Sequence, residues 1–103
     1  MNNKEIDKIV SEKVSTKISE LKRQSAKELM SLPRYTAIKF ETGGKGQELG
    51  IWHETTESGD SLIVAQCKNT HFLGIGNMYA EGLLVNSLGN IEPAPEELMW
   101  EYT

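Results

Sequence analysis

The chain has 103 residues and a mass of 11.5 kDa, which is the length of one ordinary folded domain. Hydrophobic residues make up 38% and charged residues 25%, a composition that excludes the disordered and collagen-like classes. The longest apolar run, Leu62 to Ala65, is far shorter than the roughly 20 residues of a membrane span. We therefore expect residues 1–103 to form a single soluble globular domain.

The formal net charge of −4 is distributed unevenly along the chain. Residues 1–34 contain eight of the eleven Lys and Arg residues but five of the fifteen Asp and Glu residues, which gives them a net charge of +3. Residues 35–103 carry −7. A field of that sign repels phosphate backbones and attracts cationic partners. The sequence thus predicts an acidic surface downstream of a basic N-terminal segment.

The N-terminal segment has the pattern of an amphipathic helix. Asn2 and Glu5 resemble a capping box, and apolar residues then recur mostly every three or four positions until Pro33. This predicts one helix to about Met30, within residues 1–31, with a stripe of Ile6, Ile9, Val10, Val14, Ile18, Leu21 and Leu29. Such a helix would be about 40 Å long, more than a small sheet covers. Part of the stripe is therefore expected to pack against a second copy, as a homodimer.

After Pro33 the hydrophobic pattern changes to the alternation typical of strands. We expect strands near 36–41, 49–53, 62–67, 71–75 and 78–85, with turns at 43–46, 57–60 and 76–77 and a loop at 68–70. The fold class is then α+β. It consists of a long N-terminal helix and a five-strand antiparallel β-meander over 35–85, as a strongly curved sheet or small partly open barrel. A one-helix-on-sheet sandwich is the simplest alternative.

The C-terminal residues 86–103 are expected to form a tail or short helix. Pro93 and Pro95 interrupt the strand pattern, and residues 96–100 suit either one helical turn or an extended tail that docks Trp100.

Catalytic chemistry has few candidate residues in this sequence. Cys67 could be activated by His71 if residues 68–70 form a hairpin loop that places the two side chains across the ladder. The competing interpretation is that Cys67 is a small buried hydrophobe. With His53, the chain has three nitrogen or sulfur ligands in total, whereas a structural zinc site uses four. We therefore expect no metal and no cofactor. A small Cys/His enzyme is the least favoured hypothesis.

The single cysteine cannot form an internal disulfide, and the first twenty residues lack the apolar centre of a signal peptide. Both features predict a reducing cytoplasm.

Recognition is the chemistry that the sequence favours. Aromatic residues of the kind found at interface rims, with acidic neighbours, are expected on the outer sheet face. They are Trp52, Tyr79, Trp100 and Tyr102, with Glu48, Glu54, Glu81 and Glu101. The alternative is that both tryptophans fill the interface between helix and sheet. Other acidic pairs, Glu54 with Glu57 and Glu96 with Glu97, are expected to be solvated surface charge.

The first hypothesis is a non-enzymatic interaction module whose acidic sheet, centred on Trp52 and Tyr79, binds a basic protein partner. An inhibitor or immunity-type protein that blocks a nuclease or another nucleic-acid enzyme would fit. In size and charge the chain resembles small bacterial or phage accessory proteins, including toxin-neutralising and host-inhibiting ones, and no diagnostic motif is involved. The alternative is nucleic-acid binding through the N-terminal helix, whose stripe is bordered by Lys4, Lys8, Lys13, Lys17, Lys22 and Lys27.

Overall fold

The computed structural model describes all 103 residues, except for the side chain of Phe72. Its helices and strands follow one another as α1 (Asn3–Leu21), α2 (Ala26–Met30), β1 (Tyr35–Thr42), β2 (Lys45–Thr55), β3 (Ser61–Phe72), β4 (Ile75–Val85), β5 (Ile91–Pro93), α3 (Glu96–Met99) and a 3-10 turn, η1 (Trp100–Tyr102). The five strands form one antiparallel sheet in the order β1-β2-β3-β4-β5. The predicted α+β class and five-strand meander are confirmed.

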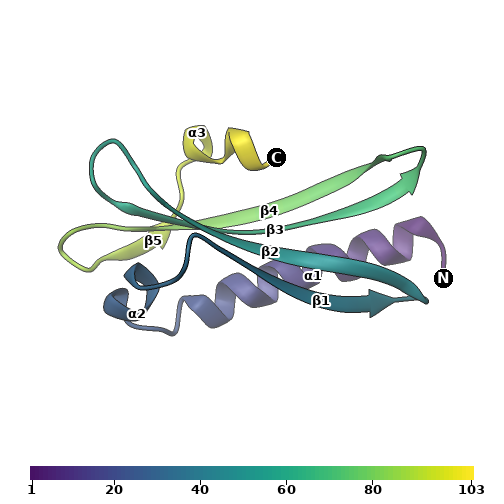
Figure 1. Cartoon of the computed structure of the whole chain (residues 1–103), viewed down its shortest axis with the longest axis horizontal. Coiled ribbons are helices and arrows are strands. Elements are labelled where there is room, and N and C mark those ends of the chain that lie inside the picture. Colours follow the sequence, from purple (N-terminus) through teal and green to yellow (C-terminus); the bar gives the residue numbers. More distant parts are fainter.

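The sheet is open, with β1 and β5 at its two edges. It is long and twisted, with α1 along one face and the C-terminal segment over the other (Figure 1). Within the described part of the chain, no helix is long and apolar enough to cross a membrane.

The N-terminal helix is shorter than expected. α1 begins as predicted, with the Asn2 side chain accepting the Glu5 N–H at 2.9 Å, but it ends at Leu21. A second start signal interrupts the periodicity: the Ser25 hydroxyl accepts the Glu28 N–H at 3.1 Å and caps α2. The prediction of one helix to Met30 is therefore wrong.

The strand boundaries also differ from those expected. β3 runs without interruption through residues 68–70, where a loop was predicted, and the following turn lies at Leu73 and Gly74. These two residues have φ of +51° and +79°, and Gly76-Asn77, the predicted turn, belongs to β4. The polar residues of this stretch look like a loop in the sequence but belong to a strand because Asn69 is buried in a polar network. The fifth strand is 91–93, which was assigned to the tail.

The larger core lies between α1 and the sheet. The predicted stripe residues Ile6, Val10, Val14, Ile18 and Leu21 are buried, and α1 packs mainly across β3 and β4. Leu29 of α2 is fully buried in the same core. Six of the seven stripe residues are thus buried in the chain's own core, and Ile9 is half-buried.

A second, smaller core lies on the opposite face, beneath α3 and η1. Leu62 and Val64 of β3 pack there against Met99 and Tyr102. Gly82 of β4 makes this packing close, because a Cβ at that position would lie 2.6 Å from the Met99 sulfur. The C-terminal residues therefore form a short helix and turn docked on the sheet.

Candidate acidic binding site

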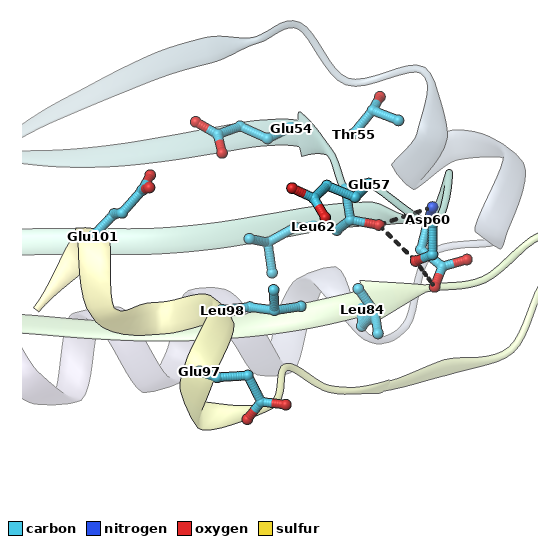
Figure 2. A pocket seen from close by; sticks show the side chains of 11 residues that line it. Glu54, Thr55, Glu57, Asp60, Leu62, Leu84, Glu97, Leu98 and Glu101 are labelled. Carbon is cyan, nitrogen blue, oxygen red and sulfur yellow. Dashed lines mark hydrogen bonds between the residues drawn. The ribbon is translucent and has the colours of Figure 1, made fainter.

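A hollow of about 590 Å³ lies where the C-terminal segment meets the turn between β2 and β3. Five carboxylates line it: Glu54, Glu57, Asp60, Glu97 and Glu101. Its apolar lining comes from Leu62 of β3, Leu84 of β4 and Leu98 of α3. Figure 2 shows the carboxylates arranged around these three leucines. We call this feature the acidic pocket.

One wall of the acidic pocket is the β2–β3 turn, which its own hydrogen bonds hold in place. The Thr56 N–H donates to the Asp60 carbonyl at 2.8 Å, and the Gly59 N–H donates to the Thr56 carbonyl at 2.9 Å. Gly59 has a φ of +89°, a conformation that glycine adopts without strain. The Ser58 hydroxyl donates to the Asp60 carboxylate at 3.2 Å. The turn therefore fixes the Asp60 carboxylate at the pocket.

The opposite wall is the C-terminal segment. The Ala94 N–H donates to the Gly82 carbonyl at 2.9 Å, which ties the chain to β4 just before α3. At the far end of the segment, the Gln66 side chain donates to the Tyr102 carbonyl at 2.7 Å. These two anchors hold Glu97 and Glu101 over the sheet.

The carboxylates of the acidic pocket form no ion pair with the described side chains, and a basic side chain, Arg34, lines a neighbouring hollow with Glu54 and Thr55. The lining of the acidic pocket itself contains no Lys or Arg. The ion pairs of the described side chains join Lys17 to Glu20 and Asp7 to His71, away from the pocket. The pocket is thus a negatively charged concavity with apolar side chains between its carboxylates.

Tyr102 lies beside this site with a buried hydroxyl. The residue is 6% exposed, and its hydroxyl has no hydrogen-bond partner among the described atoms. Burial, together with the nearby Glu54 and Glu101 carboxylates, raises the pKa of Tyr102 above the usual range of a phenol. Tyr102 therefore stays neutral and adds no charge to the acidic pocket.

Of the eight aromatic and acidic residues expected on the outer sheet face, Glu101 lines the acidic pocket, Tyr102 lies beside it, and three more lie at or near it. Glu54 lines it, and Trp100, 73% exposed, belongs to the adjoining turn η1. Trp52 is on the same sheet face but packs between Tyr35 and Tyr102, with ring centroids 4.5 Å and 6.2 Å apart. Neither tryptophan fills the interface between α1 and the sheet.

The other three predicted residues lie elsewhere. Tyr79 is opposite Cys67 in the β3–β4 ladder and packs against the α1 core, and Glu81 accepts a hydrogen bond from the Ser15 hydroxyl of α1. Both therefore lie on the helix face, so a single acidic face centred on Trp52 and Tyr79 does not exist. Glu48 shares the face of Trp52, but it lies six positions before Glu54 along β2, a distance of about 20 Å.

The cysteine and histidine residues do not come together. Cys67 and His71 belong to the same strand, so the expected pairing across a hairpin does not form. Cys67 is buried, and burial raises the pKa of its thiol. His53 lies towards the other end of the sheet, where Nδ1 is 2.8 Å from the Leu32 carbonyl and Nε2 is 3.0 Å from the Ser61 hydroxyl. Its two ring nitrogens thus link β2 and β3 to the segment after α2.

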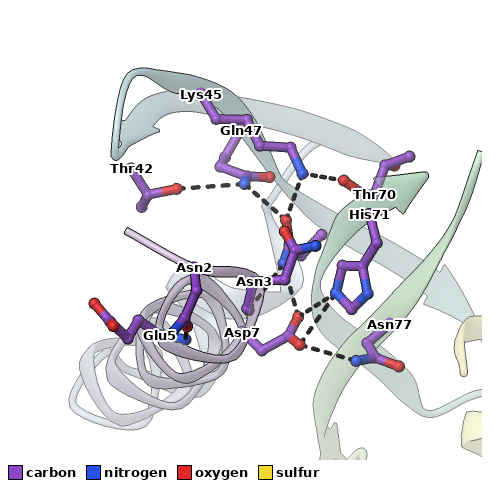
Figure 3. Close-up of polar contacts among 11 residues, drawn as sticks. Asn2, Asn3, Glu5, Asp7, Thr42, Lys45, Gln47, Thr70, His71 and Asn77 are labelled. Atoms are coloured by element: carbon purple, nitrogen blue, oxygen red, sulfur yellow. Dashed lines mark hydrogen bonds and ion pairs between the residues drawn. The ribbon is translucent and has the colours of Figure 1, made fainter.

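His71 belongs to a polar network at the start of α1 (Figure 3). The Asp7 carboxylate accepts hydrogen bonds from Asn69 at 2.8 Å and from Asn77 at 3.0 Å, and lies 3.1 Å from the His71 Nε2 atom. Asn69 is fully buried, and its side-chain oxygen accepts a hydrogen bond from the Lys45 ammonium at 2.7 Å. The network fastens the first turns of α1 to β2, β3 and β4.

Several pocket residues were missed by sequence reasoning. Glu57 and Glu97 were expected to be solvated, and Asp60 was predicted to lie in the turn at 57–60. They come from segments almost forty residues apart, so their grouping depends on how the C-terminal segment docks. The excess of acidic residues after residue 34 was the one signal in the sequence that pointed to such a site.

Comparisons with known proteins identify no relative of this chain: no family model, curated protein or solved structure matches it.

Proposed function

We propose that this protein is a non-enzymatic binding module whose acidic pocket takes a basic, partly apolar segment of a partner protein. The observation that carries the proposal is the composition of the pocket, in which five carboxylates surround three leucines without a basic side chain in the lining. A lysine or arginine side chain has an apolar stem and a charged end, so it matches both parts of this surface.

The chemistry of the partner follows from this match. Its segment presents positive charges to the Glu and Asp side chains and apolar groups to Leu62, Leu84 and Leu98. The exposed Trp100 on the adjoining turn offers an aromatic contact at the rim. A nucleic-acid enzyme with a basic active-site surface is one such partner, and the module would inhibit it by occupying that surface.

The charge of the acidic pocket predicts how salt changes the rate of binding. Negative charge that is not neutralised within the molecule accelerates encounter with a cationic partner, and salt screens this attraction. We therefore expect the association rate to fall as salt is added, with a smaller change in the dissociation rate.

The test uses a fluorescein-labelled amphipathic peptide of leucine and lysine as the probe, titrated into the full chain and followed by fluorescence anisotropy at low salt. Glu97→Gln/Glu101→Gln removes two pocket charges. Both carboxylates are exposed, and at roughly 0.7 kcal/mol for each lost charge pair, within the range for exposed pairs, binding is expected to weaken about tenfold.

The matched control is Glu12→Gln/Glu20→Gln, which changes the net charge equally on the exposed side of α1. It is expected to change the affinity less than twofold, because neither carboxylate lines the acidic pocket and no charge pair with the bound peptide is lost. Equal losses in the two double variants would show that the peptide responds to net charge alone, and the proposal would be wrong. Binding of the probe to α1 would instead favour a function of the helix surface.

A further inference from the structure

β1 is an edge strand with an unpaired side. The His53 N–H donates to the Arg34 carbonyl at 3.0 Å, which fixes the alternation of hydrogen bonds along the β1–β2 ladder. The main-chain groups of Thr36, Ile38, Phe40 and Thr42 then point to β2, and those of Tyr35, Ala37, Lys39 and Glu41 point away from the sheet. No other described main-chain segment pairs with these outward groups.

Side chains leave this edge accessible. In β1 all residues except Phe40 and Thr42 are exposed. A hollow of about 610 Å³ also lies at the β1–β2 end of the sheet and is lined by Lys39, Phe40, Glu41, Gly46, Gln47 and Glu48. The edge can therefore accept another strand.

The charges of β1 make the edge complementary to itself. Two antiparallel copies related by a two-fold axis perpendicular to the sheet place residues of the same face opposite each other. An axis through Lys39 would oppose two lysines, which is unfavourable. An axis through Phe40 places Lys39 opposite Glu41 of the second copy, and this contact occurs twice.

The side chains of β2 also favour a two-fold axis at Phe40. Within one chain, Lys39 is opposite Glu48, whereas Glu41 is opposite Gly46 and so has no side chain across the ladder. Pairing about Phe40 gives Glu41 a cation and places each Lys39 between two carboxylates. An axis through Ile38 would place Lys39 opposite Ala37 and leave Glu41 without a cation.

From this geometry we infer that the protein self-associates through β1, forming an antiparallel β1–β1 pair about a two-fold axis at Phe40 that joins two sheets into one. The inference does not depend on the acidic pocket. Five residues per strand bury less than the roughly 1,600 Å² of a standard interface, so the dimer is weak and depends on concentration.

Sedimentation velocity of the full chain at low salt, from about 10 µM to about 1 mM, measures this association. We expect the wild type to shift towards dimer across the series. Lys39→Glu and Glu41→Lys each place like charges opposite each other twice, so each is expected to weaken association about tenfold. Lys39→Glu/Glu41→Lys restores opposite charges and is expected to return the affinity to within about threefold of wild type.

Lys8→Glu makes the same charge change at an exposed position of α1 and is the control. It should associate as the wild type does, and circular dichroism verifies that all variants are folded. A wild type that stays monomeric throughout the series would overturn the inference. So would single reversals at Lys39 or Glu41 that associate as tightly as Lys8→Glu, or a double reversal whose affinity does not return towards that of the wild type.

Discussion

Replacing Asp7 by alanine tests whether the polar network holds α1 on the sheet. The carboxylate accepts hydrogen bonds from Asn69 and Asn77 and pairs with His71. Its side chain is 16% exposed, whereas Asn69 is fully buried. Asp7→Ala therefore removes the side-chain acceptor of the buried Asn69 amide.

The cost follows from what remains around Asn69. Without Asp7, its amide nitrogen keeps only the Asn3 carbonyl, at 3.5 Å, which is the limit of a hydrogen bond. A buried donor left without a partner costs about 1–3 kcal/mol. His71 and Asn77 lie nearer solvent, where water replaces the lost acceptor. We expect a loss of about 2 kcal/mol in the free energy of unfolding, or roughly 10 °C in Tm for a domain of this size.

The effect should depend on pH. Burial acts to raise the pKa of Asp7, but hydrogen bonds from Asn69, His71 and Asn77 outweigh it, so the pKa lies below its ordinary value. Stabilisation by a carboxylate of lowered pKa is complete above the unfolded value, about 3.9, and is lost as the pH falls through the folded pKa. Urea unfolding followed by circular dichroism should therefore show the gap between wild type and variant shrinking below about pH 4.

Two further variants make the result interpretable. Asp7→Asn keeps an acceptor for Asn69 without the charge, so it should cost less than Asp7→Ala and lose the pH dependence. Glu12→Ala removes an exposed carboxylate from the same helix and is expected to change stability by less than about 0.5 kcal/mol. If Asp7→Ala at pH 7 were as stable as Glu12→Ala, the network would not anchor the helix.

Two other predictions concern the sheet. A Cβ at Gly76 would lie 1.9 Å from the Asn69 carbonyl oxygen, so Gly76→Ala should lower the free energy of unfolding in urea by more than about 2 kcal/mol. A Cβ at Gly46 would have no atom within 4 Å, so Gly46→Ala should change that free energy by less than about 0.5 kcal/mol. Equal stabilities of the two variants would contradict the register of β3 and β4. Cys67 is buried, and burial raises the pKa of its thiol, so a disulfide reagent at pH 8 should modify Cys67 in urea but not in the native protein. Modification of the native protein as fast as of the unfolded protein would show that the thiol is accessible and contradict this prediction.

The parts of the fold that the sequence predicted are those with regular hydrophobic periods. The stripe from Ile6 to Leu21 faces the core, and the alternation around Ile38 and Leu49 does form the first hairpin. Errors occurred where tertiary contacts outweigh local pattern. Asn69 is a polar residue typical of loops, yet in the structure it is buried and hydrogen-bonded within a strand. Residues 91–93 include one proline and lie near a second, which is unfavourable in a strand, yet they pair with β4 and form β5.

The candidate site was less predictable for the same reason. Charge counting indicated an acidic surface but could not place Glu81, which faces α1, or Glu97, which joins Glu57 only when the C-terminal segment docks. That docking depends on Gly82 and on hydrogen bonds at Ala94 and Gln66, none of which forms a recognisable motif. The pocket is a product of the tertiary structure.

The most direct measurement is methyl NMR of the full chain during titration with the same leucine–lysine peptide. The proposed function predicts that the largest shifts occur at Leu62, Leu84 and Leu98, and that Glu97→Gln/Glu101→Gln reduces them. Shifts confined to methyl groups of α1, or the same shifts in that variant as in the wild type, would contradict the assignment of the acidic pocket as the binding site.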